Sequence, residues 1–269
     1  MTDAPILLAK YYSAPSVFQA ENLLREARRQ KGLPLKPVPQ VCVLDPDGDL
    51  VASVRAAGRA RQSPGWACYH TKLDEIDHGG ETFGIVGCAV GAAFAVLVAE
   101  QLFASGCRLL ISVTSAGQLV PLGEPPYFVL IEKALRDEGT SYHYAAPAPF
   151  AEADPALMDP IMASLADFPF PVHRGPSWTT DAPFRETEAA IAAAVQRGAV
   201  AVEMEAAALY AFAHARNRAV VCFAHVTNRM AQIEGDFEKG EADGATATLS
   251  VIAAATSAWR AAHEAESDR

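Results

Sequence analysis

The sequence lacks several features that would assign the chain to a membrane, secreted or nucleic-acid-binding class. No apolar run reaches the roughly 18 to 20 uncharged residues of a membrane span, and the N-terminus MTDAPILLAKYY lacks the basic-then-apolar order of a secretory signal. Positive charge is scarce, because 22 Lys and Arg residues stand against 32 Asp and Glu residues, for a net charge of -10. Such a balance disfavours a general nucleic-acid surface. We therefore expect a cytoplasmic protein whose partners are small molecules, with no membrane and no nucleic acid among them.

Cysteine is also sparse. The five cysteines are scattered singly and show no CxxC spacing, which indicates neither a disulfide framework nor a zinc site. No HExxH sequence and no cluster of Cys and His residues is present. We expect neither a metal nor a bound cofactor.

What the sequence does contain is an alternation of apolar strand-like segments and helical segments. Hydrophobic residues make up 51% of the 269 residues, which is ample for a large buried core. We expect strands at 41–44, 82–90, 108–113, 127–132, around 172, 200–202 and 219–226, and helices at 16–30, 92–106, 186–197, 204–216 and 242–262. A hairpin partner is expected at 50–54, and a surface loop at 145–160. The alternation predicts one α/β domain over residues 1–269, with three α/β/α layers around a mixed, largely parallel sheet.

Polar residues follow several of these strands, where an α/β sheet places its ligand crevice. The four clusters are Thr114-Ser115-Ala116-Gly117, 136–141, 179–181 and Glu203-Met204-Glu205. Two carboxylates at a helix start can be no more than favourable charges on the helix dipole. Because the residues around Glu203 and Glu205 are almost wholly apolar, we expect at least one of them to face a polar crevice. A carboxylate placed there can accept both hydroxyl protons of a ribose.

Four segments resemble the nucleoside phosphorylase family, which includes purine nucleoside phosphorylases, uridine phosphorylases and related nucleosidases. VEMEAAALYAFA (202–213) is similar to the signature helix of the family, and TSAGQLVP (114–121) to its small-residue loop. ALRDEGTSYHYAAP (134–147) resembles the uridine-type phosphorylases, and FAHVTNRMAQ (223–232) resembles the strand and loop after the signature helix. Four motifs in the family's order identify the chain as a member, closest to the uridine-type enzymes, and imply the family's fold and its pentosyltransferase activity.

The resemblance also implies roles for individual residues. Met204 and Glu205 would contact the ribose, with Glu205 accepting from the 2′ and 3′ hydroxyls, and Glu203 would lie near the base or sugar. Asp181 falls where purine-type members keep a catalytic aspartate, which would give a proton to the leaving base. Capping of the next helix is the competing role for Asp181. Arg185, one helical turn further on, could pair with Asp181, help hold the base, or lie on the surface.

The phosphate-binding groups of the family are not recognisable. The N-terminal segment ILLAKYYSAPS contains no Gly-Asp-Pro-x-Arg turn, and Ser112 stands where an arginine is expected before the small-residue loop. Either Ser115 and the 114–117 backbone hold phosphate with Arg136 or Arg55, or water is the nucleophile, as in the nucleosidases.

We expect a nucleoside phosphorylase that takes a purine or pyrimidine nucleoside, with phosphate as co-substrate, and yields free base and ribose 1-phosphate. A nucleosidase and a catalytically inactive nucleoside-binding protein are the alternatives. The family implies assembly as a homodimer, or as a hexamer built from dimers.

Overall fold

The computed structural model describes residues 4–230, 234–237 and 239–267. Ala231 and Gln232, the last two residues of the FAHVTNRMAQ segment, therefore lie outside the described residues. The elements in chain order are η1 (Pro5–Leu7), α1 (Ala20–Lys31), β1 (Val41–Asp45), α2 (Asp49–Ala56), β2 (Arg61–Gln62), β3 (Asp74–His78), β4 (Glu81–Gly87), α3 (Ala92–Ala104), β5 (Leu109–Gln118), β6 (Tyr127–Asp137), η2 (Ser141–His143), β7 (Phe150–Glu152), α4 (Pro155–Ser164), β8 (Val172–Thr180), η3 (Pro183–Arg185), α5 (Glu188–Gln196), β9 (Ala201–Glu203), α6 (Ala206–Arg216), β10 (Ala219–Asn228), η4 (Glu241–Gly244) and α7 (Ala245–Ser267).

The strands form one mixed sheet in the order β10-β6-β8-β9-β5-β1-β4-β3-β2, with β7 paired to β6. Strand β10 also pairs with β5, so β5, β10, β6, β8 and β9 close into a ring. Strands β4, β1, β5 and β10 run parallel, whereas β6 runs antiparallel to β10 and β9 antiparallel to β5. All five residues of β1 are buried, as expected for a parallel strand covered on both faces.

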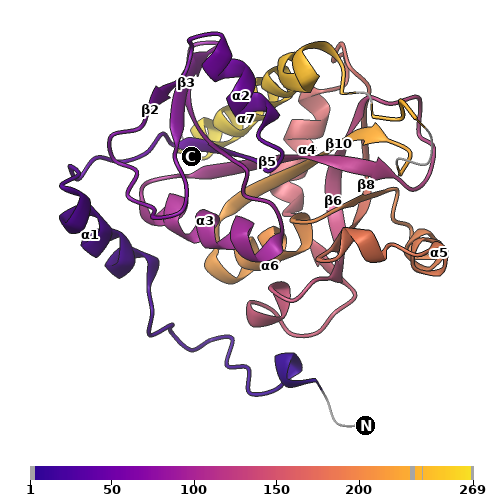
Figure 1. Ribbon diagram of the computed structural model, residues 1–269, viewed down its shortest axis with the longest axis horizontal. Helices are drawn as coiled ribbons and strands as arrows, with labels where there is room; N and C mark the ends of the chain where they lie inside the picture. The colour runs from indigo at the N-terminus through magenta and orange to yellow at the C-terminus, as the bar shows by residue number, and fades with distance from the viewer. Residues whose placement is uncertain (1–3, 231–233, 238, 268–269) are drawn as a thin grey trace.

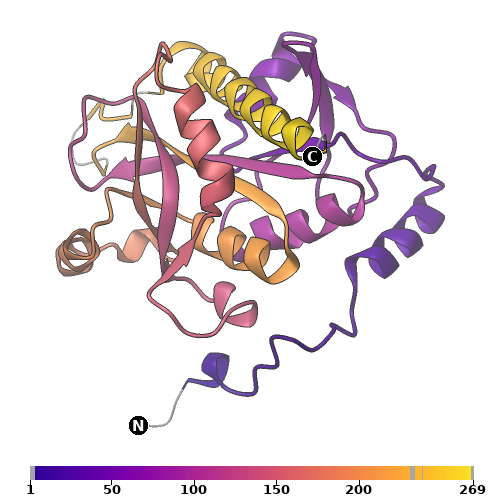
Figure 2. The same cartoon turned by 180° about the vertical axis from the view of Figure 1, so that it is seen from behind.

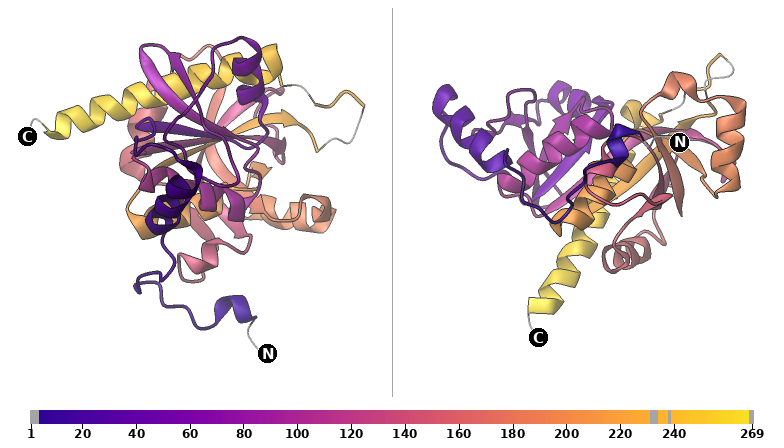
Figure 3. Two further views of the ribbon diagram at one scale, coloured as in Figure 1. Left: turned by 60° about the vertical axis from the view of Figure 1, so that its left-hand side comes forward. Right: turned by 90° about the horizontal axis from the view of Figure 1, so that it is seen from below.

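Helices cover both faces of the sheet. Helices α3 and α6 pack together on the face turned to the viewer in Figure 1, and α4 and α7 pack together on the face seen in Figure 2. Helix α1 contacts α3 from outside, and the described arm that precedes it, 4–19, extends away from the sheet (Figure 3). This is the mixed α/β/α architecture that the sequence predicted.

The segment 50–54 is helical, so its prediction as a hairpin strand was wrong. Asp45 caps the first turn of α2, because its carboxylate accepts the backbone N–H groups of Gly48 at 3.2 Å and Val51 at 2.9 Å. Leu50, Val51 and Val54 are buried together on one face of that helix.

The segment 145–160 is not a plain surface loop either, because it contains β7 and the first half of α4. Asp154 begins α4 by accepting the N–H of Ala156 at 3.0 Å, and Pro155 occupies the first turn, where a missing N–H costs nothing. The segment packs on the sheet through β7, which pairs with β6.

Candidate active site

Two of the four predicted polar clusters, 114–117 and 203–205, meet beyond the carboxyl ends of β1, β4 and β5. Gly91, in the turn between β4 and α3, donates its backbone N–H to Glu205 Oε1 over 2.7 Å. Ser115, near the end of β5, donates its backbone N–H to Asp47 Oδ2, also over 2.7 Å. The Thr114 hydroxyl and the Asp47 carboxylate also interact with Glu205, so the turn after β1, the turn after β4, the end of β5 and the start of α6 belong to one site.

Glu205 lies at the centre of this site and is only 1% exposed. Its Oε2 atom is buried and has no hydrogen-bond partner among the described residues. Burial and then the neighbouring Glu203 carboxylate raise the pKa of Glu205 to about 8, while the Gly91 N–H and the Thr114 hydroxyl oppose that rise. A buried acceptor without a donor costs about 1–3 kcal/mol, so a ligand hydroxyl donating to Oε2 would relieve a real penalty.

Both carboxylate oxygens of Glu203 accept hydrogen bonds from other residues of the protein, so neither is left for a ligand. Its Oε2 accepts the backbone N–H groups of Glu205 and Ala206, both over 2.7 Å, and its Oε1 accepts the hydroxyls of Ser177, over 2.9 Å, and Thr179. Burial raises the pKa of Glu203, and these donors oppose the rise. Glu203 therefore ties β8 and β9 to the first turn of α6 and fixes the position of Glu205. Between the two carboxylates, Met204 is half-buried.

The small residues 114–117, predicted as a loop, form the end of β5 and pair with both β9 and β10. Thr114 and Ala116 are buried, while Ser115 and Gly117 are partly exposed. A Cβ atom on Gly117 would lie 2.5 Å from Met230 Sδ, so a larger residue there would require the methionine side chain to move.

Asp181 follows β8 and is exposed. Its Oδ2 accepts the backbone N–H of Gly139 over 2.8 Å, which ties the end of β8 to the loop after β6. The local capping contact comes from Thr180, whose Oγ1 accepts the N–H of Ala182 at 3.2 Å, so Asp181 does not cap the following turn. Arg185 is exposed in η3, and no ion pair joins it to Asp181 within the described ranges.

Comparison with known proteins decides the family. Residues 41–262 match the family model described as the phosphorylase superfamily. The chain belongs to the phosphorylase superfamily. Its fold is similar to that of uridine phosphorylase from Vibrio fischeri ES114, with 20% identity, a TM-score of 0.66 and coverage of 92% of this chain and 97% of that chain. It is also similar to purine nucleoside phosphorylase from Toxoplasma gondii in complex with immucillin-H, with 13% identity, a TM-score of 0.67 and coverage of 84% and 93%.

Neither arginine that the sequence suggested for holding phosphate in this superfamily member contacts the end of β5. Arg136 is buried, and its guanidinium donates to Ser141 Oγ over 2.8 Å and to the carbonyls of Ala145 and Ala146. Arg55 donates to Asp74 over 2.5 Å. The positions of these two side chains therefore do not support a role for Arg136 or Arg55 in holding phosphate at the end of β5.

Sequence reasoning missed the turn after β1 as part of the site. Asp45-Pro46 matches the second and third residues of the superfamily's Gly-Asp-Pro-x-Arg pattern, while Leu44 replaces the glycine and Gly48 the arginine. That partial match was the available signal, and it lies at 44–48, beyond the N-terminal segment 6–16 where the turn was expected. Asn228 was also missed: it is buried at the end of β10, opposite Gly117 in the register.

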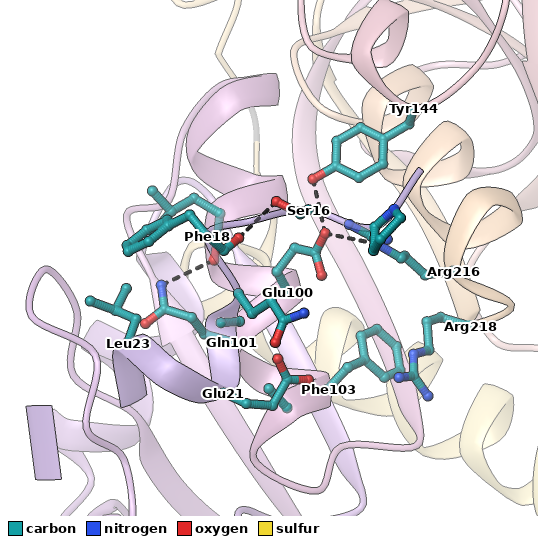
Figure 4. A pocket seen from close by; sticks show the side chains of 15 residues that line it. Ser16, Phe18, Glu21, Leu23, Glu100, Gln101, Phe103, Tyr144, Arg216 and Arg218 are labelled. Atoms are coloured by element: carbon teal, nitrogen blue, oxygen red, sulfur yellow. Dashed lines mark hydrogen bonds and ion pairs between the residues drawn. The ribbon is translucent and has the colours of Figure 1, made fainter. Parts of the chain in front are cut away.

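Three larger cavities are lined by other parts of the chain, and one of them, of about 580 Å³, lies among residues 31–72. A second, of about 490 Å³, lies between the arm, α3 and the C-terminal end of α6, where Glu100 accepts from both Tyr144 and Arg216 (Figure 4). The third, of about 610 Å³, is lined by α6, β7 and Arg136. Of the predicted site residues, Arg136 alone lines any of these three cavities.

The described residues show neither a metal-binding cluster nor a membrane-spanning helix. They contain no group of three or more His, Cys, Asp or Glu side chains that could hold a metal ion. No helix within those ranges is long and apolar enough to cross a bilayer.

Proposed function

We propose that this protein cleaves the N-glycosidic bond of a nucleoside. The observation that carries the proposal is the buried carboxylate of Glu205, with Oε1 fixed by Gly91 and Oε2 unpaired. A ribose offers two adjacent hydroxyl donors, and a hydrogen bond to a charged acceptor contributes about 1.5–3 kcal/mol. Such donors would favour the charged form of Glu205 and lower its raised pKa when the sugar binds.

The same carboxylate suits the chemistry of the bond. As the bond breaks, positive charge develops on the ribose and negative charge on the leaving base, so a fixed anion beside the sugar stabilises the transition state. Asp181 is the proposed proton donor to the base. Its support is its place in the sheet: Thr179, two residues earlier, lies opposite Glu203 in the register of β8 and β9.

Phosphate is the nucleophile that the superfamily suggests, and a phosphorylase would give free base and ribose 1-phosphate. Hydrolysis is the second candidate, and the Asp47 carboxylate at the N–H of Ser115 favours it, because an anion already occupies that donor. A purine or a pyrimidine base, a dimeric or hexameric assembly, and a cytoplasmic location stay predictions.

The test is to incubate the purified protein with adenosine, inosine, guanosine, cytidine and uridine, each with and without phosphate, and to measure free base by chromatography. Release of base in either condition would support the proposal, and dependence on phosphate would identify the phosphorylase. No release from any nucleoside, together with measurable nucleoside binding by calorimetry, would contradict catalysis and favour the nucleoside-binding alternative.

A further inference from the structure

The cavity of about 490 Å³ in Figure 4 lies apart from the candidate active site. Its wall is formed by the end of the arm and the start of α1, by the second half of α3, and by the C-terminal end of α6. Glu205 stands at the opposite end of α6, which is 11 residues long, so on the order of 15 Å separates the two places. The volume falls within the range of about 300–1,000 Å³ that is typical of small-molecule sites.

Apolar side chains on this wall are left open to solvent. Phe18 on the arm is 75% exposed, and Leu97 on α3 is 41% exposed. Phe103 lines the same cavity, and the guanidinium of Arg218 lies over its ring, 5.4 Å from the centroid. A flat ring inserted here would cover apolar surface and meet aromatic and guanidinium faces, both of which favour stacking.

Two side-chain acceptors at the cavity have no donor. Gln101 is only 2% exposed, and its Oε1 atom has no hydrogen-bond partner among the described residues. Its Nε2 atom donates to the carbonyl of Leu97 over 3.1 Å, which fixes the end of the amide that carries the oxygen. Glu100 accepts from Tyr144 and Arg216 through Oε1, and its Oε2 takes no hydrogen bond within the described ranges. A ligand that fits this cavity therefore carries N–H or O–H donors.

The charges on the wall nearly cancel. Arg216 pairs with Glu100, and the exposed Glu21 offsets Arg218. Because Arg218 forms no ion pair within the described part of the chain, its N–H groups can donate to a carbonyl or ring nitrogen. A flat, uncharged heterocycle with N–H donors beside ring acceptors suits such a wall better than an anion or a cation does. A free nucleobase has these properties.

The two helices that line the cavity also begin at the candidate active site. Gly91, directly before α3, donates its N–H to Glu205, directly before α6, over 2.7 Å. At the other end of the pair, Arg216 Nε lies 3.1 Å from Glu100 Oε1, and the helices pack together between these contacts. Because helices are stiff, a ligand that changes their spacing at one end also shifts Gly91 against Glu205 at the other.

We propose that this cavity is a second binding site for a free nucleobase, and that a base bound there slows cleavage at Glu205. The proposal rests on the proposed function, because the base is a product of the cleavage. The ring covers Phe18 and Leu97, and an N–H group of the ring donates to Gln101 Oε1. The protein thereby reduces its own activity as free base accumulates.

The experiment compares the wild type with Phe18→Ala, Gln101→Leu and the control Val17→Ala. Val17 and Phe18 are neighbours on the arm, and Val17 is fully exposed and does not line the cavity. Calorimetric titration with adenine, hypoxanthine and uracil gives the number of bases bound per chain and their affinities. Initial rates at saturating nucleoside, with and without the base that the nucleoside releases, give kcat. The thermal unfolding midpoint shows that each variant is folded.

We expect the wild type and Val17→Ala to bind two bases per chain, one at Glu205 and one in the cavity. Phe18→Ala and Gln101→Leu should weaken the second by roughly tenfold, the size expected for one lost hydrogen bond or ring contact, and leave the first unchanged. All four proteins should have the same kcat without added base. Added base should lower kcat by roughly twofold or more in the wild type and Val17→Ala, and by less in the two cavity variants.

Equal numbers and affinities of bound bases in the wild type, Phe18→Ala and Gln101→Leu would overturn the proposal. An equal fall in kcat in all four proteins would also overturn it, because the base would then act at Glu205 itself. If no nucleoside is cleaved, the proposed function fails, and the effect on cleavage fails with it. Calorimetry then still decides whether the cavity holds a base, because a second base bound by the wild type and weakened in both cavity variants would establish the site.

Discussion

At the scale of single residues, Glu205 carries the largest expected effect. Glu205→Gln keeps the shape of the side chain but replaces the charged acceptor, so the hydrogen bonds to the sugar weaken and the developing positive charge loses its partner. We expect kcat/KM to fall by roughly 100-fold or more, which corresponds to about 3 kcal/mol of transition-state stabilisation. Base release measures this loss. Glu188→Gln, an exposed glutamate at the start of α5, is the control and should keep normal kinetics.

Asp181 could act by positioning a loop or by donating a proton, because its carboxylate also accepts the N–H of Gly139. A substitution at this residue can distinguish the two roles. Asp181→Asn retains an oxygen acceptor for that N–H, so the loop after β6 should stay in place. We expect kcat to fall by roughly 100-fold with little change in KM, the size expected for loss of a general acid. A raised KM with an unchanged kcat would instead show that Asp181 only shapes the binding site.

At the scale of elements, the junction of β8, β9 and α6 depends on Glu203. Glu203→Ala would leave the N–H groups of Glu205 and Ala206 and the hydroxyls of Ser177 and Thr179 without their acceptor in a buried place. We expect a loss of about 3 kcal/mol or more in the free energy of unfolding, measured by urea denaturation. An unchanged unfolding free energy with lost activity would mean that Glu203 acts on the substrate and not on the helix.

The same elements show how far the sequence could predict the structure. The parallel strands β1, β4, β5 and β10 and the signature helix were readable, because continuous apolar runs mark buried parallel strands and α6 carries a known motif. Strands β2, β3 and β7 were not predicted. The run at 50–54 was not, because five residues of mixed apolar character fit a strand or a helix equally well. The helix forms there because of the cap by Asp45, a contact that the apolar pattern does not reveal.

Some residues of the candidate site could likewise be predicted from the sequence, and others could not. Glu205 could be found from its local sequence, since a carboxylate among alanines at a helix start is unusual. The part played by Asp47 could not, because it depends on a contact with Ser115, 68 residues further along the chain. Arg136 was misjudged for the same reason: its partners lie in the folded loop at 141–146, and the sequence alone suggested a free cation.

At the scale of the whole molecule, the stability of the fold depends on pH, because two buried carboxyl groups of the site have raised pKa values. Burial and neighbouring carboxylates raise the pKa of Glu205 from 4.5 to about 8 and that of Asp45 from 3.8 to about 7. A carboxyl group with a raised folded-state pKa binds its proton more tightly in the folded protein, so its contribution to stability is complete below the unfolded pKa and disappears as pH rises through the folded value. His225 acts oppositely: its pKa falls from 6.5 to about 4, so its contribution is lost as pH falls below 6.5.

These signs define a pH window in which the carboxyl groups dominate the change in stability. Between pH 4 and 6.5 the histidine offsets part of the carboxyl effect, whereas from pH 6.5 to 8 the folded His225 is neutral and the unfolded form loses its remaining charge, so the effect of the histidine fades. Over that upper interval we expect the free energy of unfolding to fall by on the order of 2 kcal/mol, since each pKa unit corresponds to about 1.4 kcal/mol. Urea denaturation at pH 6.5, 7.2 and 8 measures the fall. Glu205→Gln, which is neutral at every pH, should remove most of it, and an equally steep fall in this variant would show that the proton is held elsewhere.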